Sequence, residues 1–232
     1  MIDCRNFTFT PISDKTLEVD LYHYLEYVTS ASAPSAVRKS IHRAIIDFTG
    51  YTKTDFICRT IEIDSISDDH INTVGTLNIQ SQRLAAMASK TSSPSYITAY
   101  AITLGPGIDD IIAERQKDSM LDAYITDAAG SVVIEHYIKK LHEYLADEYK
   151  KKGFLITERY SPGYCDWDIR EGQRELFEFL HPEEIGIHIL PSSAMMPQKS
   201  VTSIVIGAQE VPHKTPCPFC NYTECPHRKI LD

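Results

Sequence analysis

Residues 159–164, Arg-Tyr-Ser-Pro-Gly-Tyr, combine side chains that can recognise a charged ligand. An arginine binds a carboxylate through two parallel hydrogen bonds. Glycine lets a ligand approach the backbone, and tyrosine offers a face to a flat ring or a cation. The segment therefore suits a ligand with a carboxylate, an adenine and a positive centre. The alternative is an ordinary Ser-Pro-Gly turn beside a surface arginine, because short patterns of this kind are common.

A second candidate lies near the C-terminus, where Cys217, Cys220 and Cys225 form a Cys-x2-Cys-x4-Cys pattern. This is a reasonable spacing for metal ligands. The three thiolates could hold zinc or an iron–sulfur cluster. The alternative is three reduced thiols in a flexible tail. Three residues are candidates for a fourth ligand: His227, His213 and Cys165.

Composition restricts the kind of protein. A chain of 232 residues buries enough surface to fold without disulfides, so we expect the scattered cysteines to be reduced. The net charge of −9 argues against a general nucleic-acid binder and against docking on an anionic membrane. No apolar run reaches the ~20 residues that span a bilayer, and the first residues lack an apolar signal core. We expect a cytoplasmic protein that binds neither nucleic acid nor membrane.

Apolar periodicity predicts the elements that position these candidates. The longest periodic segment, 119–152, predicts one amphipathic helix with a bend at Gly130. The mixture of helices and strands without regular βαβ alternation indicates an α+β or irregular α/β fold. Residues 208–232 contain four prolines and little apolar content, so we predict a domain over 1–207 followed by a Cys-rich tail. Further helices are predicted over 15–30, 34–50, 79–90, 108–116 and 170–179, and strands over 59–63, 96–104, 185–190 and 200–206.

Several of these segments resemble one known family in the same order. Residues 159–164 resemble the Arg-x-x-x-Gly-Tyr motif in the activation domain of cobalamin-dependent methionine synthase, a domain that binds S-adenosylmethionine. Residues 194–201 resemble its Ala-Met-x-Pro-x-x-Ser-Val segment, and 96–105 resemble its central strand. Residues 128–145 resemble the long helix after that strand, with Glu135 at a matching acidic position. The resemblance is strongest over 95–207.

The resemblance implies a fold and a binding site. The fold would be a C-shaped single α+β domain in which helices flank a twisted antiparallel sheet. Arg159 would pair with the carboxylate of S-adenosylmethionine, and Glu135 would contact its charged end or the surroundings of that end. The remaining ligand-lining residues would be Ser161, Pro162, Gly163 and Tyr164.

The resemblance also implies a role in repairing a cofactor. In the family, the domain docks over the corrinoid when cob(II)alamin forms. An electron from a flavoprotein and a methyl group from S-adenosylmethionine then restore methylcobalamin. The present sequence has no Asp-x-His-x-x-Gly corrinoid motif, so we expect cobalamin on a partner chain. The protein would be a component of methionine synthase activity rather than a complete enzyme.

Two departures leave an alternative open. The family's aromatic residues just after the Ser-Val strand have no counterpart in Val205-Ile206-Gly207-Ala208, and the cysteine tail is not part of the family domain. The leading hypothesis is a free-standing activation domain that serves a separately encoded methionine synthase. The alternative is a metal- or cluster-bearing partner of another corrinoid methyltransferase, which keeps the fold but does not bind S-adenosylmethionine.

Overall fold

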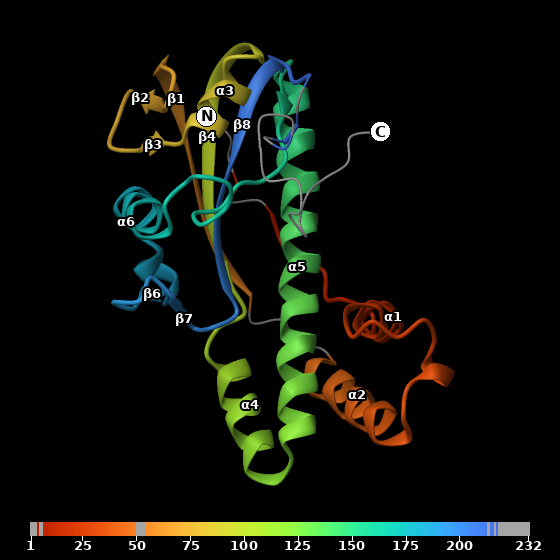
Figure 1. The fold of residues 1–232 in the computed structure, drawn as a ribbon. Helices are drawn as coiled ribbons and strands as arrows, with labels where there is room; N and C mark the ends of the chain where they lie inside the picture. Colours follow the sequence, from red (N-terminus) through yellow and green to blue (C-terminus); the bar gives the residue numbers. More distant parts are fainter. Residues whose placement is uncertain (1–3, 5–6, 50–53, 213, 216, 218–232) are drawn as a thin grey trace.

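The computed structural model of the chain describes residues 4, 7–49, 54–212, 214, 215 and 217. Its centre is a six-stranded sheet in the order β3-β2-β1-β4-β8-β5, in which every neighbouring pair is antiparallel. The three long strands run side by side along the molecule (Figure 1). The strands are β1 (Asp55–Ile66), β2 (His70–Thr73), β3 (Asn78–Gln80), β4 (Ser92–Thr103), β5 (Leu155–Ile156) and β8 (Ser200–Glu210).

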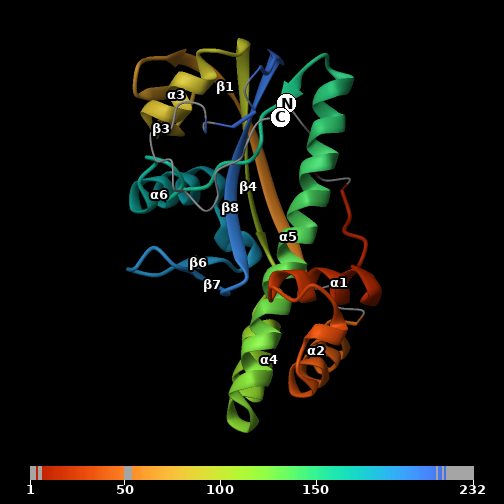
Figure 2. The same ribbon diagram turned by 45° about the vertical axis from the view of Figure 1, so that its right-hand side comes forward.

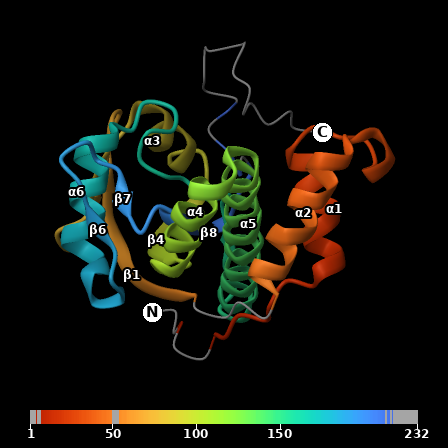
Figure 3. The same cartoon turned by 90° about the horizontal axis from the view of Figure 1, so that it is seen from below.

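Helices cover both faces of this sheet, as the view from below shows (Figure 3). One face packs against the long helix α5, and the pair α1–α2 packs on the outer side of α5. The other face carries α3 and α6. A short hairpin of β6 (His188–Ile189) and β7 (Met195–Met196) lies beside α6 (Figure 2). The helices are α1 (Asp14–Tyr24), α2 (Ser35–Phe48), α3 (Gln82–Ala88), α4 (Gly107–Asp118), α5 (Met120–Lys151) and α6 (Ile169–Leu180).

The central strand β4 explains why the sheet needs cover on both sides. Residues 97–103 of this strand are all buried, so side chains that alternate between the two faces meet protein on each. A continuous apolar run of this kind is typical of a strand in the middle of a layered fold. The predicted α+β fold, with a twisted antiparallel sheet flanked by helices, is therefore confirmed.

Helix α5 is continuous through Gly130, where the sequence predicted a bend. The glycine also has a packing role. A Cβ at this position would lie 3.0 Å from Cε of Lys199. The Lys199 ammonium group continues past the glycine to Asp127 at 2.8 Å and Ser131 at 3.0 Å. Gly130 thus lets the chain that enters β8 lie directly against α5.

Other predicted boundaries shift for local reasons. The helix predicted over 79–90 begins only at Gln82, because Ser81 accepts a hydrogen bond from the Leu84 amide and caps it. The strand predicted over 185–190 is reduced to β6, which follows a 3-10 turn. Strand β8 continues to Glu210, three residues beyond the predicted end of the domain. None of the helices in the described ranges is long and apolar enough to cross a membrane.

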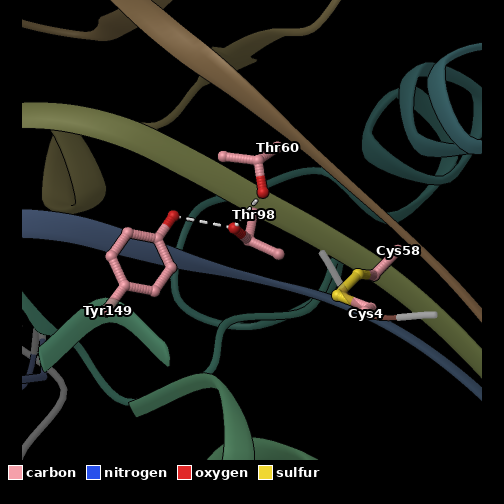
Figure 4. Close-up of a disulfide and its surroundings, with 5 residues drawn as sticks. All are labelled: Cys4, Cys58, Thr60, Thr98 and Tyr149. Carbon is pink, nitrogen blue, oxygen red and sulfur yellow. Dashed lines mark hydrogen bonds between the residues drawn. A yellow bond between two sulfur atoms is a disulfide. The ribbon is translucent and has the colours of Figure 1, made fainter. Parts of the chain in front are cut away.

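The expectation of reduced cysteines is wrong for one pair, because Cys4 and Cys58 form a disulfide with Cα atoms 6.4 Å apart (Figure 4). The N-terminal segment carries Phe7 and Phe9, whose rings pack edge-on against Phe56 of β1. This packing brings Cys4 beside the strand that contains Cys58. The sequence did not reveal this pairing, because the two cysteines are 54 residues apart.

Candidate functional site

Residues 155–161 follow β8 along the edge of the sheet, and we call them the edge segment. Leu155 and Ile156 pair with β8 as β5. Tyr160 and Ile204 then exchange backbone hydrogen bonds of 2.9 and 2.7 Å. Because side chains alternate along an extended chain, Arg159 and Ser161 face α5 while Tyr160 packs into the core on the opposite face.

The edge segment brings Arg159 to Glu135, which lies in the middle of α5. Nη2 of Arg159 donates to both carboxylate oxygens of Glu135, at 2.8 and 2.9 Å. The two side chains are 26% and 56% exposed, so the pair is accessible from solvent. A cation and an anion from distant parts of the sequence therefore stand together at the sheet edge.

Two further polar residues lie beneath this ion pair. Tyr100 of β4 is directly opposite Ser203 of β8 in the strand register, so both point toward α5. The hydroxyls of Ser203 and Ser161 are 2.7 Å apart and share a hydrogen bond. Burial raises the pKa of Tyr100 to about 12, although the positive charge of Arg159 and the nearby Ser203 hydroxyl both lower it.

Tyr100 and Ser203 were not among the residues predicted from the sequence. Tyr100 lies in the segment that resembles the family's central strand, but neither residue was expected at the site, and they meet the edge segment through the register of β4 and β8. Alternation along the two strands was the available signal. It places both residues on one face but does not reveal that the edge segment would join them.

The chain turns sharply after Ser161. Gly163 has a φ of +90°, a conformation that favours glycine, and its amide donates to the Trp167 carbonyl at 2.8 Å. The Tyr164 amide donates to the Ser161 carbonyl at 3.1 Å. The Tyr164 side chain is 49% exposed, so it presents an aromatic face at the surface. Pro162 is buried and lies against Gly172 of α6 rather than facing solvent.

The structure therefore brings together most, but not all, of the predicted ligand residues. Arg159, Glu135 and Ser161 form one group toward α5. Gly163 shapes the turn, and Tyr164 is exposed beyond it. Pro162 packs toward α6, so its part is to hold the turn.

The missing aromatic residues after the Ser-Val strand have a structural explanation. Val205 and Ile206 are fully buried on opposite faces of the sheet. A Cβ on Gly207 would lie only 2.2 Å from Cε1 of Tyr149 in α5. No side chain can replace this glycine without moving Tyr149, so an aromatic wall cannot form there.

The start of the C-terminal segment is anchored on the edge segment. The Lys214 carbonyl accepts hydrogen bonds from the Glu158 amide at 2.9 Å and from the Tyr160 hydroxyl at 2.7 Å. Of the predicted metal ligands, only Cys217 and the alternative ligand Cys165 lie in the described part of the chain, which holds no group of three or more metal-binding side chains. The remaining candidates fall outside it: Cys220, Cys225, His213 and His227.

Chemically, the site offers recognition rather than covalent catalysis. An arginine and a glutamate present opposite charges, and the turn that follows the arginine exposes an aromatic ring. Such an arrangement can hold a small zwitterionic molecule by exchanging the internal ion pair for contacts to the ligand. Buried hydroxyls beneath the pair fix the backbone from which Arg159 projects.

Comparison with known proteins gives one family. Residues 78–213, more than half of the chain, match the model described as "Vitamin B12 dependent methionine synthase, activation domain". A solved structure described as the MetH reactivation domain bound to AdoHcy is similar in fold, with a TM-score of 0.59 and 15% sequence identity. The similarity covers 93% of this chain and 85% of that one. A search of curated proteins gave no match.

Proposed function

Since the chain belongs to the family of activation domains of vitamin B12-dependent methionine synthases, we propose that it binds S-adenosylmethionine at the edge segment and supports reductive methylation of cob(II)alamin. The cobalamin belongs to a separate chain in this proposal. The present protein supplies the methyl donor and a docking face, and it is a component of methionine synthase activity rather than a complete enzyme.

The ion pair between Arg159 and Glu135 carries the proposal. S-adenosylmethionine has a carboxylate at one end of its amino-acid part and positive charges on its ammonium and sulfonium groups. Arg159 can donate two parallel hydrogen bonds to the carboxylate in a planar geometry, and Glu135 can face the cation. An exposed ion pair contributes only about 0–1 kcal/mol, so a ligand with both charges can replace it readily.

The residues around the pair complete the site. The exposed Gly163 lets a ligand approach the backbone, and the exposed ring of Tyr164 can contact the adenine or the sulfonium. Tyr149 leaves no room for a side chain at position 207. In this proposal the face of Tyr164 therefore supplies the aromatic contact that the family takes from residues after the Ser-Val strand.

The chemistry requires two donors. One electron from a reductase, such as a flavoprotein, lowers the oxidation state of the partner's cobalt. The methyl group of S-adenosylmethionine then passes to the reduced metal, and S-adenosylhomocysteine leaves. The present chain needs no nucleophile or general base for this transfer, which agrees with a site built from charges and backbone. We expect the protein to work in the cytoplasm, together with the corrinoid partner and the reductase.

Reconstitution tests the proposal. A cobalamin-dependent methionine synthase that lacks its own activation domain is allowed to accumulate cob(II)alamin and is then mixed with this protein, a reductant and methyl-labelled S-adenosylmethionine. We expect label on cobalamin and restored homocysteine methylation only when all components are present. Methyl transfer to homocysteine by this chain alone, or no recovery with any corrinoid partner, would overturn the proposal.

The alternative function makes a different prediction in the same assay. A metal- or cluster-bearing partner of another corrinoid methyltransferase would promote reduction of the corrinoid without binding S-adenosylmethionine. The anchoring of the Cys-rich segment at Lys214 favours a role for that segment, and this role is compatible with either function.

A further inference from the structure

We propose that the buried hydroxyl of Tyr100 is a further ligand contact, which donates a hydrogen bond to the same ligand carboxylate that Arg159 binds. This role rests on the proposed function, because the carboxylate is that of S-adenosylmethionine. Tyr100 would then help the site to select ligands that carry an amino-acid carboxylate.

The strand register places Tyr100 in one row with the edge segment. Tyr100 of β4 is the direct partner of Ser203 in β8. Because Tyr160 pairs with Ile204, the next residue of the edge segment, Ser161, comes opposite Ser203. The hydroxyls of Ser161 and Ser203 are 2.7 Å apart. The row therefore crosses three neighbouring chains on the face of the sheet that packs against α5.

The ion pair belongs to the same cluster. Arg159 precedes Ser161 by two residues, so both side chains are on the face toward α5. From there the guanidinium reaches Glu135 in α5. The charges of Arg159 and Glu135 both act on the phenol of Tyr100, which agrees with this arrangement.

The Tyr100 hydroxyl has no hydrogen-bond partner. The side chain is fully buried, and no donor or acceptor within the described ranges lies at hydrogen-bonding distance from its oxygen. Its neighbour in the strand register, Ser203, bonds Ser161 instead. A buried hydroxyl without a partner opposes folding, and a phenylalanine would fill the same space without this cost. The hydroxyl therefore needs an explanation other than packing.

Two other buried tyrosines show the usual behaviour. The Tyr149 hydroxyl shares a 2.7 Å hydrogen bond with Thr98 (Figure 4). The Tyr160 hydroxyl donates to the Lys214 carbonyl at 2.7 Å. Tyr100 differs from both, and it is the tyrosine that shares a row with the residues beside the ion pair.

A ligand carboxylate supplies the acceptor that Tyr100 lacks. When this carboxylate replaces Glu135 on Arg159, it brings two oxygens into the cluster, and the guanidinium leaves some of their lone pairs unused. Burial raises the pKa of Tyr100 to about 12, so the phenol keeps its proton at neutral pH and can donate it in a hydrogen bond. The ligand would thus satisfy a group that folding leaves unpaired.

The decisive variant is Tyr100→Phe, which removes the hydroxyl and keeps the ring. Tyr149→Phe is the matched control, because it removes a buried hydroxyl that has a partner. This control lies 14 residues beyond Glu135 along α5, or about 21 Å by the helical rise. For each protein, calorimetry measures the dissociation constants of S-adenosylmethionine and of decarboxylated S-adenosylmethionine. Urea unfolding without ligand measures the stability.

We expect Tyr100→Phe to weaken binding of S-adenosylmethionine by about 10- to 100-fold, the range for a hydrogen bond to a charged group. Its affinity for the decarboxylated ligand should not change, and its urea midpoint should equal or exceed that of the wild type. Tyr149→Phe should unfold at a lower urea concentration and bind both ligands as the wild type does.

The contrary results separate this role from the proposed function. Unchanged affinity of Tyr100→Phe for S-adenosylmethionine, or an equal loss for both ligands, would overturn the role of Tyr100 alone. A lower urea midpoint for Tyr100→Phe would also overturn it, since the hydroxyl would then have a partner in the ligand-free protein. A wild type that does not bind S-adenosylmethionine would overturn both.

Discussion

Arg159 and Glu135 are 24 residues apart in the sequence, yet one guanidinium nitrogen bonds both carboxylate oxygens, at 2.8 and 2.9 Å. The pair links the sheet edge to the middle of α5 without being buried. Each charged side chain therefore has a partner when no ligand is bound, and a ligand can still displace that partner. This relationship makes the two residues the most informative positions for mutation.

Glu135→Gln should distinguish ligands by charge. S-adenosylmethionine carries a sulfonium, whereas S-adenosylhomocysteine has a neutral thioether at the same position. Loss of the carboxylate should weaken binding of S-adenosylmethionine by up to about fivefold, the range of an exposed ion pair, and should affect S-adenosylhomocysteine less. Competition binding measures the ratio of the two dissociation constants. An unchanged ratio would show that Glu135 does not face the sulfonium.

Reduction of the disulfide between Cys4 and Cys58 should destabilise the fold. The bond spans 54 residues of sequence, and the chain-entropy argument gives roughly 4 kcal/mol for such a loop, of which real proteins often show less. Urea unfolding with and without a thiol reductant measures the difference. Cys4→Ser/Cys58→Ser should unfold like the reduced protein in both conditions, and equal stability of oxidised and reduced wild type would contradict the prediction.

Gly207→Ala should be destabilising by roughly 1–3 kcal/mol, the usual range for overpacking. The added Cβ meets the ring of Tyr149, and this ring cannot swing away because its hydroxyl shares a 2.7 Å hydrogen bond with Thr98 (Figure 4). Combined with Tyr149→Ala, the substitution should add no further loss of stability. A full additional loss in the double variant would locate the strain elsewhere.

Glu175→Gln should raise stability at neutral pH and above. Burial raises the pKa of Glu175 to about 7, and one of its oxygens is buried without a hydrogen-bond partner in the described parts of the chain. Arg174 and His70 lower this pKa, whereas Glu171 and Glu178 raise it.

The direction of this change in stability with pH follows from proton linkage. Because the folded pKa is above the unfolded value, the protonated form favours folding, and this contribution is lost as the pH rises from about 4.5 to about 7. The difference in urea midpoint between variant and wild type should therefore grow across this interval. A constant difference would show that Glu175 does not titrate as described.

The sequence predicted the elements with strong periodicity and missed those that depend on tertiary contacts. The apolar spacing of 119–152 located α5 to within a residue or two at each end. Strands β2 and β3 were missed because four and three residues are too few to show alternation. The packing role of Gly130 was not predicted, since helix propensity cannot reveal that the side chain of Lys199 lies against it.

The candidate site was likewise predicted only in part. Arg159, Gly163 and Glu135 could be proposed from the sequence because they stand in recognisable segments. Tyr100 and Ser203 were not proposed, because their place at the site depends on the pairing of β4 with β8. The hydrogen bonds that hold the Lys214 carbonyl on the edge segment are likewise not predicted by any pattern.

Calorimetric titration of the protein with S-adenosylmethionine, in parallel with Arg159→Ala, tests the central claim most directly. We predict saturable binding to the wild type and a loss of about 1.5–3 kcal/mol in the variant, the range for a hydrogen bond to a charged group. Arg159→Lys should restore little, because lysine lacks the planar fork. Arg59→Ala is the matched control, since it removes an arginine that pairs with Glu184 away from the site, and it should bind normally. Absence of binding to the wild type at millimolar ligand, with and without a corrinoid partner, would contradict the account.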